Sequence, residues 1–343
     1  MDIKVTSFGD NAQLYSLEND HGYKLQITNF GARIVNLFVP TSTGERNIVL
    51  GFDSAEEYLE KDAYMGATIG RVAGRIADGK FQIGAKSYKV ATQKDHQTLH
   101  GGPHSFEEKY WDTELVQKED AVQVLFSLTS FDEENGFPGE LSAMVSYTLT
   151  NENKWKLEYQ ATTDQPTLYN PTNHVYFNLT GDVTQSVAEH KLTLKADRFA
   201  PIGEEHGVLG EILSVENTPF DFQTGARLTQ VFDSKDPQVQ RAGGLDHPFF
   251  FADSYKGRPA VLESPDSQVR VTMASTEPAV VIFTAQFGDE PIIMHGKQLA
   301  THGGITLETQ VAPGATEFKG FGNILLNPED YYTSATTFLI ETN

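Results

Sequence analysis

The chain contains no cysteine, and this absence removes several kinds of chemistry at once. Without a thiol there is no disulfide, no cysteine nucleophile and no thiolate-bound metal. Long apolar runs are also missing, since no segment approaches the ~18 consecutive apolar residues that mark a membrane-spanning helix. The segment 1–10 lacks the apolar stretch of a secretory signal. We therefore expect a cytoplasmic protein.

Basic residues are scarce as well. Among 343 residues, 26 Lys and Arg stand against 47 Asp and Glu, which gives a net charge of −21 and a pI near 4.8. Such an acidic surface repels nucleic acid and anionic membranes, and it disfavours a polyanionic substrate without excluding one. The sequence also lacks a phosphate-binding glycine loop, a dinucleotide fingerprint and a Gly-x-Ser-x-Gly nucleophile elbow.

Helical signal is sparse, whereas alternation of apolar and polar residues is frequent. One short helix is predicted over 54–60, with Ser54 and Glu57 as a capping box. Period-two patterns predict two hairpins, 141–149 with 155–161 and 81–83 with 88–90. Further strands are expected at 23–28, 34–39, 121–128, 191–195, 269–273, 280–284 and 304–309.

Strands do not alternate with long helices, so a parallel α/β sheet is disfavoured. Many short strands separated by turn residues are typical of a sandwich. We therefore predict an all-β fold, a large antiparallel β-sandwich with a few short helices. No linker, low-complexity tract or internal repeat divides the chain, which predicts a single domain over 1–343.

The segment 170–179 joins two unlike halves around His174. Asn-Pro-Thr-Asn before the histidine is typical of a turn, and Val-Tyr-Phe after it indicates the start of a strand. A titratable group at the mouth of a strand is well placed for chemistry on a rigid support. Taken alone, the same histidine could equally satisfy a hydrogen bond within a turn.

Glu308 lies within another strand pattern, next to the glycine pair at 303–304. Alternation places it on one face with Thr306 and Gln310, opposite the apolar Ile305 and Leu307. A carboxylate on a polar strand face is either ordinary surface or the lining of a polar cleft.

Three more segments combine glycines with a polar or titratable side chain. They are Arg75 in 70–76, His100 in 99–102 and Asp246 in 243–248. Glycine beside such a side chain lets a backbone or ligand approach closely, although Asp246 is also suited to a structural turn. His247 precedes a proline and is expected to be extended and structural.

Other titratable residues are assigned ordinary roles. His100 and His104 are four residues apart, but two glycines and a proline between them prevent a helix from aligning them, so no metal site is expected. His295 and His302 are predicted to lie in surface loops. The charged run 107–109 is predicted to be solvated, because charged residues are rarely buried.

Together these motifs resemble the galactose mutarotase (aldose 1-epimerase) family, and the match spans nearly the whole chain. The matching segments, in order, are 29–32, 70–76, 99–102, 170–179, 217–222, 245–249 and 307–310. The resemblance implies a β-sandwich with a cleft across a concave sheet. It also implies interconversion of the α- and β-anomers of free aldoses, D-galactose and D-glucose especially, in hexose metabolism.

The resemblance also implies roles for individual residues. His174 resembles the general acid and Glu308 the general base, while Arg75 and His100 resemble residues that bind and polarise the sugar near its ring oxygen. Asp246 resembles a carboxylate that binds a hydroxyl. No cofactor and no metal are implied. In one departure, Gly74 stands where many relatives have Asn, which removes one possible sugar contact.

The chemistry fits these residue types. Opening a cyclic hemiacetal needs a base for the C1 hydroxyl and an acid for the ring oxygen, and a Glu308 carboxylate with a His174 imidazolium supplies both near neutral pH. The expected partner is a monosaccharide, bound by a monomer or homodimer. The competing hypotheses are a glycoside hydrolase using Asp246 and Glu308, a hexose-6-phosphate 1-epimerase, and a non-catalytic carbohydrate-binding protein.

Overall fold

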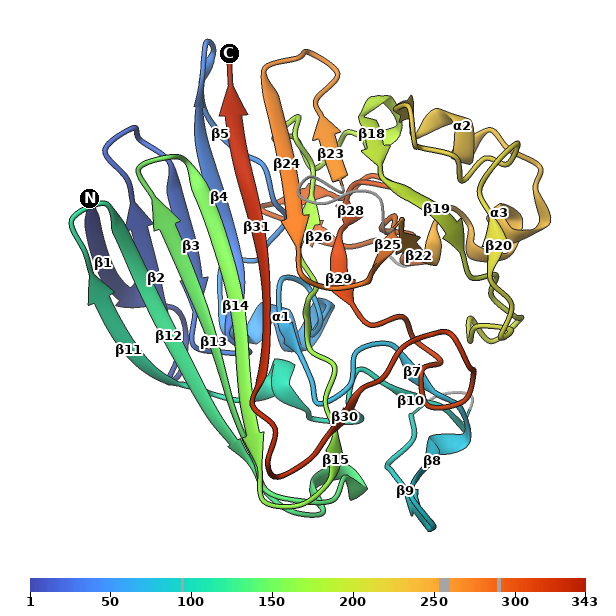
Figure 1. Ribbon diagram of the computed structural model, residues 1–343. Coiled ribbons are helices and arrows are strands. Elements are labelled where there is room, and N and C mark those ends of the chain that lie inside the picture. The colour runs from blue at the N-terminus through green and yellow to red at the C-terminus, as the bar shows by residue number, and fades with distance from the viewer. Residues whose placement is uncertain (94–95, 253–259, 289–290) are drawn as a thin grey trace.

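Long antiparallel strands build the largest sheet, as the alternating sequence predicts. The computed structural model describes residues 1–93, 96–252, 260–288 and 291–343. Its nine-stranded sheet curves across the molecule (Figure 1). The chain's C-terminal strand lies in the interior of this sheet, with a long strand on either side. In spatial order the strands are β11 (Asp112–Gln117), β12 (Ala121–Ser130), β13 (Leu141–Thr150), β14 (Lys154–Thr163), β31 (Tyr332–Thr342), β24 (Val269–Ser275), β23 (Ala260–Glu263), β18 (Lys191–Leu194) and β21 (Ala226–Arg227).

Two five-stranded antiparallel sheets pack against the nine-stranded sheet. The first is β1 (Asp2–Ser7), β2 (Gln13–Glu18), β3 (Lys24–Thr28), β4 (Arg33–Thr41) and β5 (Gly44–Asn47). The second is β20 (Leu213–Ser214), β19 (Ala196–Phe199), β22 (Asp246–Phe251), β25 (Ala279–Phe283) and β29 (Glu308–Gln310). One apolar core contains residues of all three sheets, among them Leu25, Val145 and Ile282. The architecture is a large antiparallel β-sandwich, which confirms the predicted fold class.

Short ladders and helices decorate the sandwich. The ladders are β7 (Arg75–Ile76) with β10 (Thr98–Leu99), β6 (Thr68–Ile69) with β16 (Thr172–Asn173), β17 (Tyr176–Phe177) with β28 (Ile305–Thr306), β15 (Thr167–Leu168) with β30 (Leu325–Leu326), β8 (Lys80–Ile83) with β9 (Lys86–Lys89), and β26 (Ile293–Met294) with β27 (Lys297–Gln298). The α-helices are α1 (Ala55–Lys61), α2 (Thr229–Phe232) and α3 (Pro237–Ala242); the 3₁₀ turns are η1 (Ala77–Gly79), η3 (Phe106–Glu108), η4 (Glu134–Gly136) and η5 (Val187–Glu189). Among the described residues, no helix is long and apolar enough to cross a membrane.

Both predicted hairpins are confirmed, and the other predicted strands form within a few residues of their expected bounds. The predicted helix is α1, where Ser54 accepts a hydrogen bond from the Glu57 amide. The reciprocal half of the capping box does not form, because the Glu57 carboxylate bonds to Lys61 instead. The predicted strand 304–309 is interrupted at Leu307, since β28 pairs with β17 whereas β29 pairs with β25.

The prediction of a turn over 170–173 is wrong, because this segment is extended. Asn170 forms a bridge with Val72, and Thr172 and Asn173 form β16. The polar side chains that suggested a turn bond to distant backbone instead. The Asn170 amide donates to Val311 O at 2.9 Å and accepts from Val311 N at 3.0 Å. The Thr172 hydroxyl donates to Thr309 O at 3.0 Å, so the segment leading to His174 is tied directly to β29 and the residue after it.

Asn170→Ala should therefore lower the free energy of unfolding by about 2–4 kcal/mol, because it leaves both polar backbone atoms of Val311 without their partner. Urea unfolding followed by circular dichroism measures the change. Asn327→Ala, which removes an exposed amide bonded within its own turn to Asp330, is the control and should change stability little. An unchanged midpoint for Asn170→Ala would contradict the fastening role.

Candidate active site

One face of the second five-stranded sheet forms the floor of a cavity of about 600 Å³. Asp246 pairs with Phe283 across β22 and β25, and Val281 pairs with Glu308 across β25 and β29. Paired residues of neighbouring antiparallel strands share a face. Gln310 lies two residues after Glu308 and so projects on the same side. All five side chains line the cavity, while their alternating neighbours face the core.

Glu308 lies at the bottom of this floor and is only 2 % exposed. Its Oε1 accepts a hydrogen bond from the Thr306 hydroxyl at 2.9 Å. Burial raises the pKa of Glu308 to about 8, because a carboxylate loses its hydration in the cavity; the Thr306 bond and Arg75 oppose this effect and Asp246 adds to it. Of the three residues that alternation placed on one polar face, Glu308 and Gln310 line the cavity, and Thr306 is buried and bonds to Glu308.

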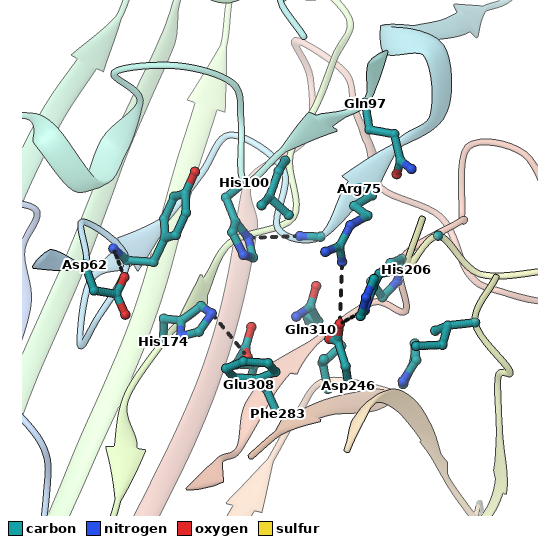
Figure 2. Close-up of a pocket in the computed structure, with 18 of the residues that line it drawn as sticks. Asp62, Arg75, Gln97, His100, His174, His206, Asp246, Phe283, Glu308 and Gln310 are labelled. Atoms are coloured by element: carbon teal, nitrogen blue, oxygen red, sulfur yellow. Dashed lines mark hydrogen bonds and ion pairs between the residues drawn. The ribbon is translucent and has the colours of Figure 1, made fainter. Parts of the chain in front are cut away.

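His174 faces Glu308 from the neighbouring segment, with Nε2 at 3.5 Å from Glu308 Oε1 (Figure 2). Its backbone is held by hydrogen bonds to Ala67 O and from Gly66 N. Burial lowers the pKa of His174, and the carboxylate of Asp62 opposes that change. The expected imidazolium and carboxylate are thus not the forms that burial favours. Burial penalises both charges and shifts the shared proton towards Glu308.

Arg75 and His100 are brought together by the small β7–β10 ladder, in which Arg75 pairs with Leu99. The His100 Nδ1 accepts a hydrogen bond from Gly74 N at 3.2 Å, which leaves the proton of a neutral imidazole on Nε2. Burial, followed by His174 and Arg75, keeps the pKa of His100 well below its usual value. His100 is therefore a neutral hydrogen-bond donor, and its ring packs edge-on against His174 at 5.3 Å between centroids.

Asp246 opens β22 on the opposite side of the cavity (Figure 2). His206 Nδ1 lies 2.9 Å from Asp246 Oδ2, and Arg75 Nη1 lies 4.0 Å from the same oxygen. Burial raises the pKa of Asp246, but the His206 bond and Arg75 outweigh it and hold the pKa below its usual value. Asp246 is thus a carboxylate whose Oδ1 is left to accept a hydrogen bond from a ligand, and it is no structural turn.

The five predicted site residues converge in this one cavity, and the structure adds others that the sequence argument missed. Both amide atoms of Gln310 are buried without a partner among the described residues, although Gln310 shares the polar face of Glu308. His206 and Asp62 stand in segments that carried no motif. Aromatic rings complete the walls, namely Tyr64, Tyr176, Phe283 and Phe287.

The remaining histidines separate into different environments. His104 is exposed and its Nδ1 lies 2.6 Å from Glu108 Oε2, whereas His100 faces the cavity, so the two do not form a pair. His247 is buried in a strand, as expected. His295 is exposed, as predicted, beside Asp53. His302 lies in a turn, as predicted, but it is half-buried, because its ring stacks on Phe232 at 4.0 Å and its Nδ1 lies 2.9 Å from Thr284 O.

The charged run 107–109 is also not uniformly solvated. Glu107 is 1 % exposed, and its carboxylate accepts from Ser105 N while its carbonyl oxygen accepts from the buried Arg33. Burial raises the pKa of Glu107 to about 7. The prediction failed because these partners come from the local 3₁₀ turn and from a strand more than seventy residues away.

The backbone conformation and the neighbours of Gly74 explain why a glycine fits this position, which the sequence alone did not show. Its φ is +78°, and a Cβ there would lie 2.5 Å from Pro313 Cγ. A larger residue at position 74 would therefore collide with Pro313 in this chain. The backbone N–H of Gly74 donates to His100 Nδ1, so the main chain at this position helps to orient His100.

Known proteins are similar to this chain in sequence and in fold. The family model described as aldose 1-epimerase matches residues 13–339. Galactose mutarotase of Bos taurus is 35 % identical over 340 residues, covering 96 % of each chain. Aldose 1-epimerase of Escherichia coli K12 is 32 % identical over 335 residues, covering 96 % of this chain and 95 % of its own. The crystal structure of galactose 1-epimerase from Lactobacillus acidophilus superposes with a TM-score of 0.89 at 27 % identity, covering 100 % and 98 % of the two chains.

The sandwich and these relatives place the chain in a class of carbohydrate isomerases. It belongs to the aldose 1-epimerase family.

The raised pKa of Glu308 predicts a pH-dependent stability difference. The folded state holds this proton more tightly than the unfolded chain, so its contribution is complete below about pH 4.5 and is lost as the pH rises through about 8. Glu308→Gln removes that loss. The free energy of unfolding of the variant, minus that of the wild type, should therefore rise by on the order of 3–5 kcal/mol between about pH 5 and about pH 9.

Thermal unfolding at several pH values measures this difference. Glu140→Gln, which neutralises an exposed carboxylate, is the control and should show no comparable trend. If the Glu308→Gln and wild-type curves stay parallel across the range, Glu308 is not a protonated buried acid.

Proposed function

We propose that the protein interconverts the α- and β-anomers of free aldohexoses, D-galactose and D-glucose, by opening and reclosing the sugar ring. The observation that carries the proposal is the 3.5 Å approach of His174 Nε2 to Glu308 Oε1 inside the cavity. The hydroxyl and ring oxygens of a hemiacetal are bonded to the same carbon. An acid and a base that serve these two oxygens must therefore be immediate neighbours, as these groups are.

The cavity suits a neutral sugar. Its volume of about 600 Å³ lies within the range of small-ligand sites. The Lys and Arg side chains that line its described part are Lys61, held by Glu57, and Arg75, drawn to Asp246. Carboxylates outnumber these cations along the walls, which does not favour the phosphate of a hexose 6-phosphate.

Proton counting supports the same pair. A neutral His174 beside a protonated Glu308 holds as many protons as an imidazolium beside a carboxylate, which is one more than a neutral histidine beside a carboxylate. We infer that the sugar reacts with the second form. Glu308 takes the proton of the C1 hydroxyl while His174 Nε2–H protonates the ring oxygen and the C–O bond breaks. The aldehyde rotates about C1–C2, the ring closes on its other face with the roles reversed, and no cofactor is consumed.

The remaining predicted residues would bind the sugar. His100, neutral and with its proton on Nε2, would donate a hydrogen bond near the ring oxygen, which leaves the acid role to His174. Arg75 would polarise the same region, and Asp246 would accept from a hydroxyl. We further propose that the enzyme is one domain over 1–343, acts in the cytoplasm and works as a monomer or homodimer.

Variants of the acid–base pair test the mechanism. Glu308→Gln should abolish turnover while sugar binding changes little, and His174→Asn should lower kcat by roughly 10²–10⁴-fold, because each removes a positioned proton-transfer group. Polarimetry on freshly dissolved α-D-galactose measures the rate. Controls are Glu140→Gln and His104→Asn, which change exposed residues outside the cavity. A near-wild-type rate in either site variant would contradict its assigned role.

The same samples separate the competing hypotheses. Release of nitrophenol from an aryl galactoside would indicate a glycoside hydrolase that uses Asp246 and Glu308, and we expect none. Faster anomerisation of glucose 6-phosphate than of galactose would indicate the phosphate-specific enzyme. Sugar binding without anomerisation would leave only a carbohydrate-binding role.

The one-proton requirement predicts a bell-shaped dependence of kcat/KM on pH. Above about pH 8 the pair loses its proton and no acid remains. At low pH it gains a second proton, and no base remains. Initial rates from polarimetry, corrected for uncatalysed mutarotation at each pH, measure the profile. A rate that stays constant well above pH 8 would show that Glu308 and His174 do not share the reacting proton.

A further inference from the structure

Asp62 lies behind His174 and has two different oxygens. The residue follows α1, and its Oδ1 accepts a hydrogen bond from Tyr64 N at 2.9 Å, which closes a local turn. Its Oδ2 is buried without a hydrogen-bond partner anywhere in the described chain. Leaving a buried carboxylate oxygen without a hydrogen bond costs free energy. The turn explains the position of Oδ1 but not the burial of Oδ2.

His174 also has a buried atom without a partner. Its Nε2 faces Glu308, and its Nδ1 is buried with no partner among the described residues. Asp62 and His174 both line the cavity, and Figure 2 shows the imidazole between the carboxylates of Asp62 and Glu308. The proposed mechanism passes a proton through Nε2 alone, so it leaves both Nδ1 and Asp62 unused.

We propose that Asp62 is a positioning residue, which orients the His174 ring through Nδ1 and stabilises the imidazolium that donates to the ring oxygen. The inference rests on the proposed function. A carboxylate behind an imidazole fixes the tautomer and supports the charge that the ring acquires. Here that support is needed, because the buried site otherwise disfavours a charged histidine.

The other groups around His174 do not supply this support. Besides Asp62, the titratable groups that surround the ring are Tyr64 after α1, His100 beyond β10, Tyr176 of β17, Asp246 of β22 and Glu308 of β29. Glu308 is the base and Asp246 is held by His206. Asp62 is also the leading influence that raises the pKa of His174 against burial.

The decisive variant is Asp62→Asn, because an asparagine Oδ1 can keep the hydrogen bond from Tyr64 N while the charge is lost. We expect kcat for α-D-galactose to fall by about 10- to 100-fold with little change in KM. We also expect the acid limb of the pH profile to move to lower pH, because the pair takes up its second proton less readily. Asp62→Ala, which also loses the turn bond, should show the same fall in kcat and an additional loss of thermal stability.

Asp182→Asn is the matched control. Asp182 accepts from Thr184 N in a similar turn outside this cavity, so its variant removes one carboxylate charge and keeps one turn bond. Its kcat and pH profile should equal those of the wild type. Wild-type kcat and an unshifted acid limb in Asp62→Asn would overturn the inference, as would activity loss confined to Asp62→Ala.

Histidine ¹⁵N chemical shifts test the same point in the unmodified enzyme and do not depend on whether a variant folds. With the His174 signal assigned by His174→Asn, Nδ1 should carry a proton at neutral pH. An unprotonated Nδ1 would refute the role of Asp62. The proposed function fails separately, if the wild-type protein does not accelerate mutarotation at all.

Discussion

The structure depends on how the segment before His174 is fastened to the strand that carries Glu308. Two side chains of that segment, Asn170 and Thr172, bond to backbone atoms of Val311 and Thr309. These bonds replace the hydrogen bonds to water that the same polar groups would make if they were exposed. They also hold His174 close to Glu308, since these two residues are attached to the two backbones that the bonds join.

Desolvation then decides the electrostatics of the cavity. The same burial that raises the pKa of Glu308 lowers the pKa of His174, so the pair rests in an uncharged form. The pKa of Asp246 is lowered instead, because its neighbours His206 and Arg75 outweigh the effect of burial. One cavity thus holds a carboxyl group poised to exchange a proton and a carboxylate that stays charged, and the difference comes from neighbours alone.

Much of the fold could be predicted from the sequence, and so could five of the residues that line the cavity. Alternation is a local property, so the strands and the polar face of Glu308 were visible in it. The extended course of 170–173 was not visible, because its amide and hydroxyl bond to residues about 140 positions away. Asp62, His206 and the buried Glu107 were missed for the same reason: each acquires its environment from elements distant in sequence.

Gly74 and Pro313 show how such distant contacts constrain change. They lie more than two hundred residues apart in the sequence, yet a side chain at position 74 and the proline ring compete for the same space. The two positions therefore form a single unit of variation. A side chain at position 74 would need space that the Pro313 ring occupies, so the residue at either position limits what the other can become.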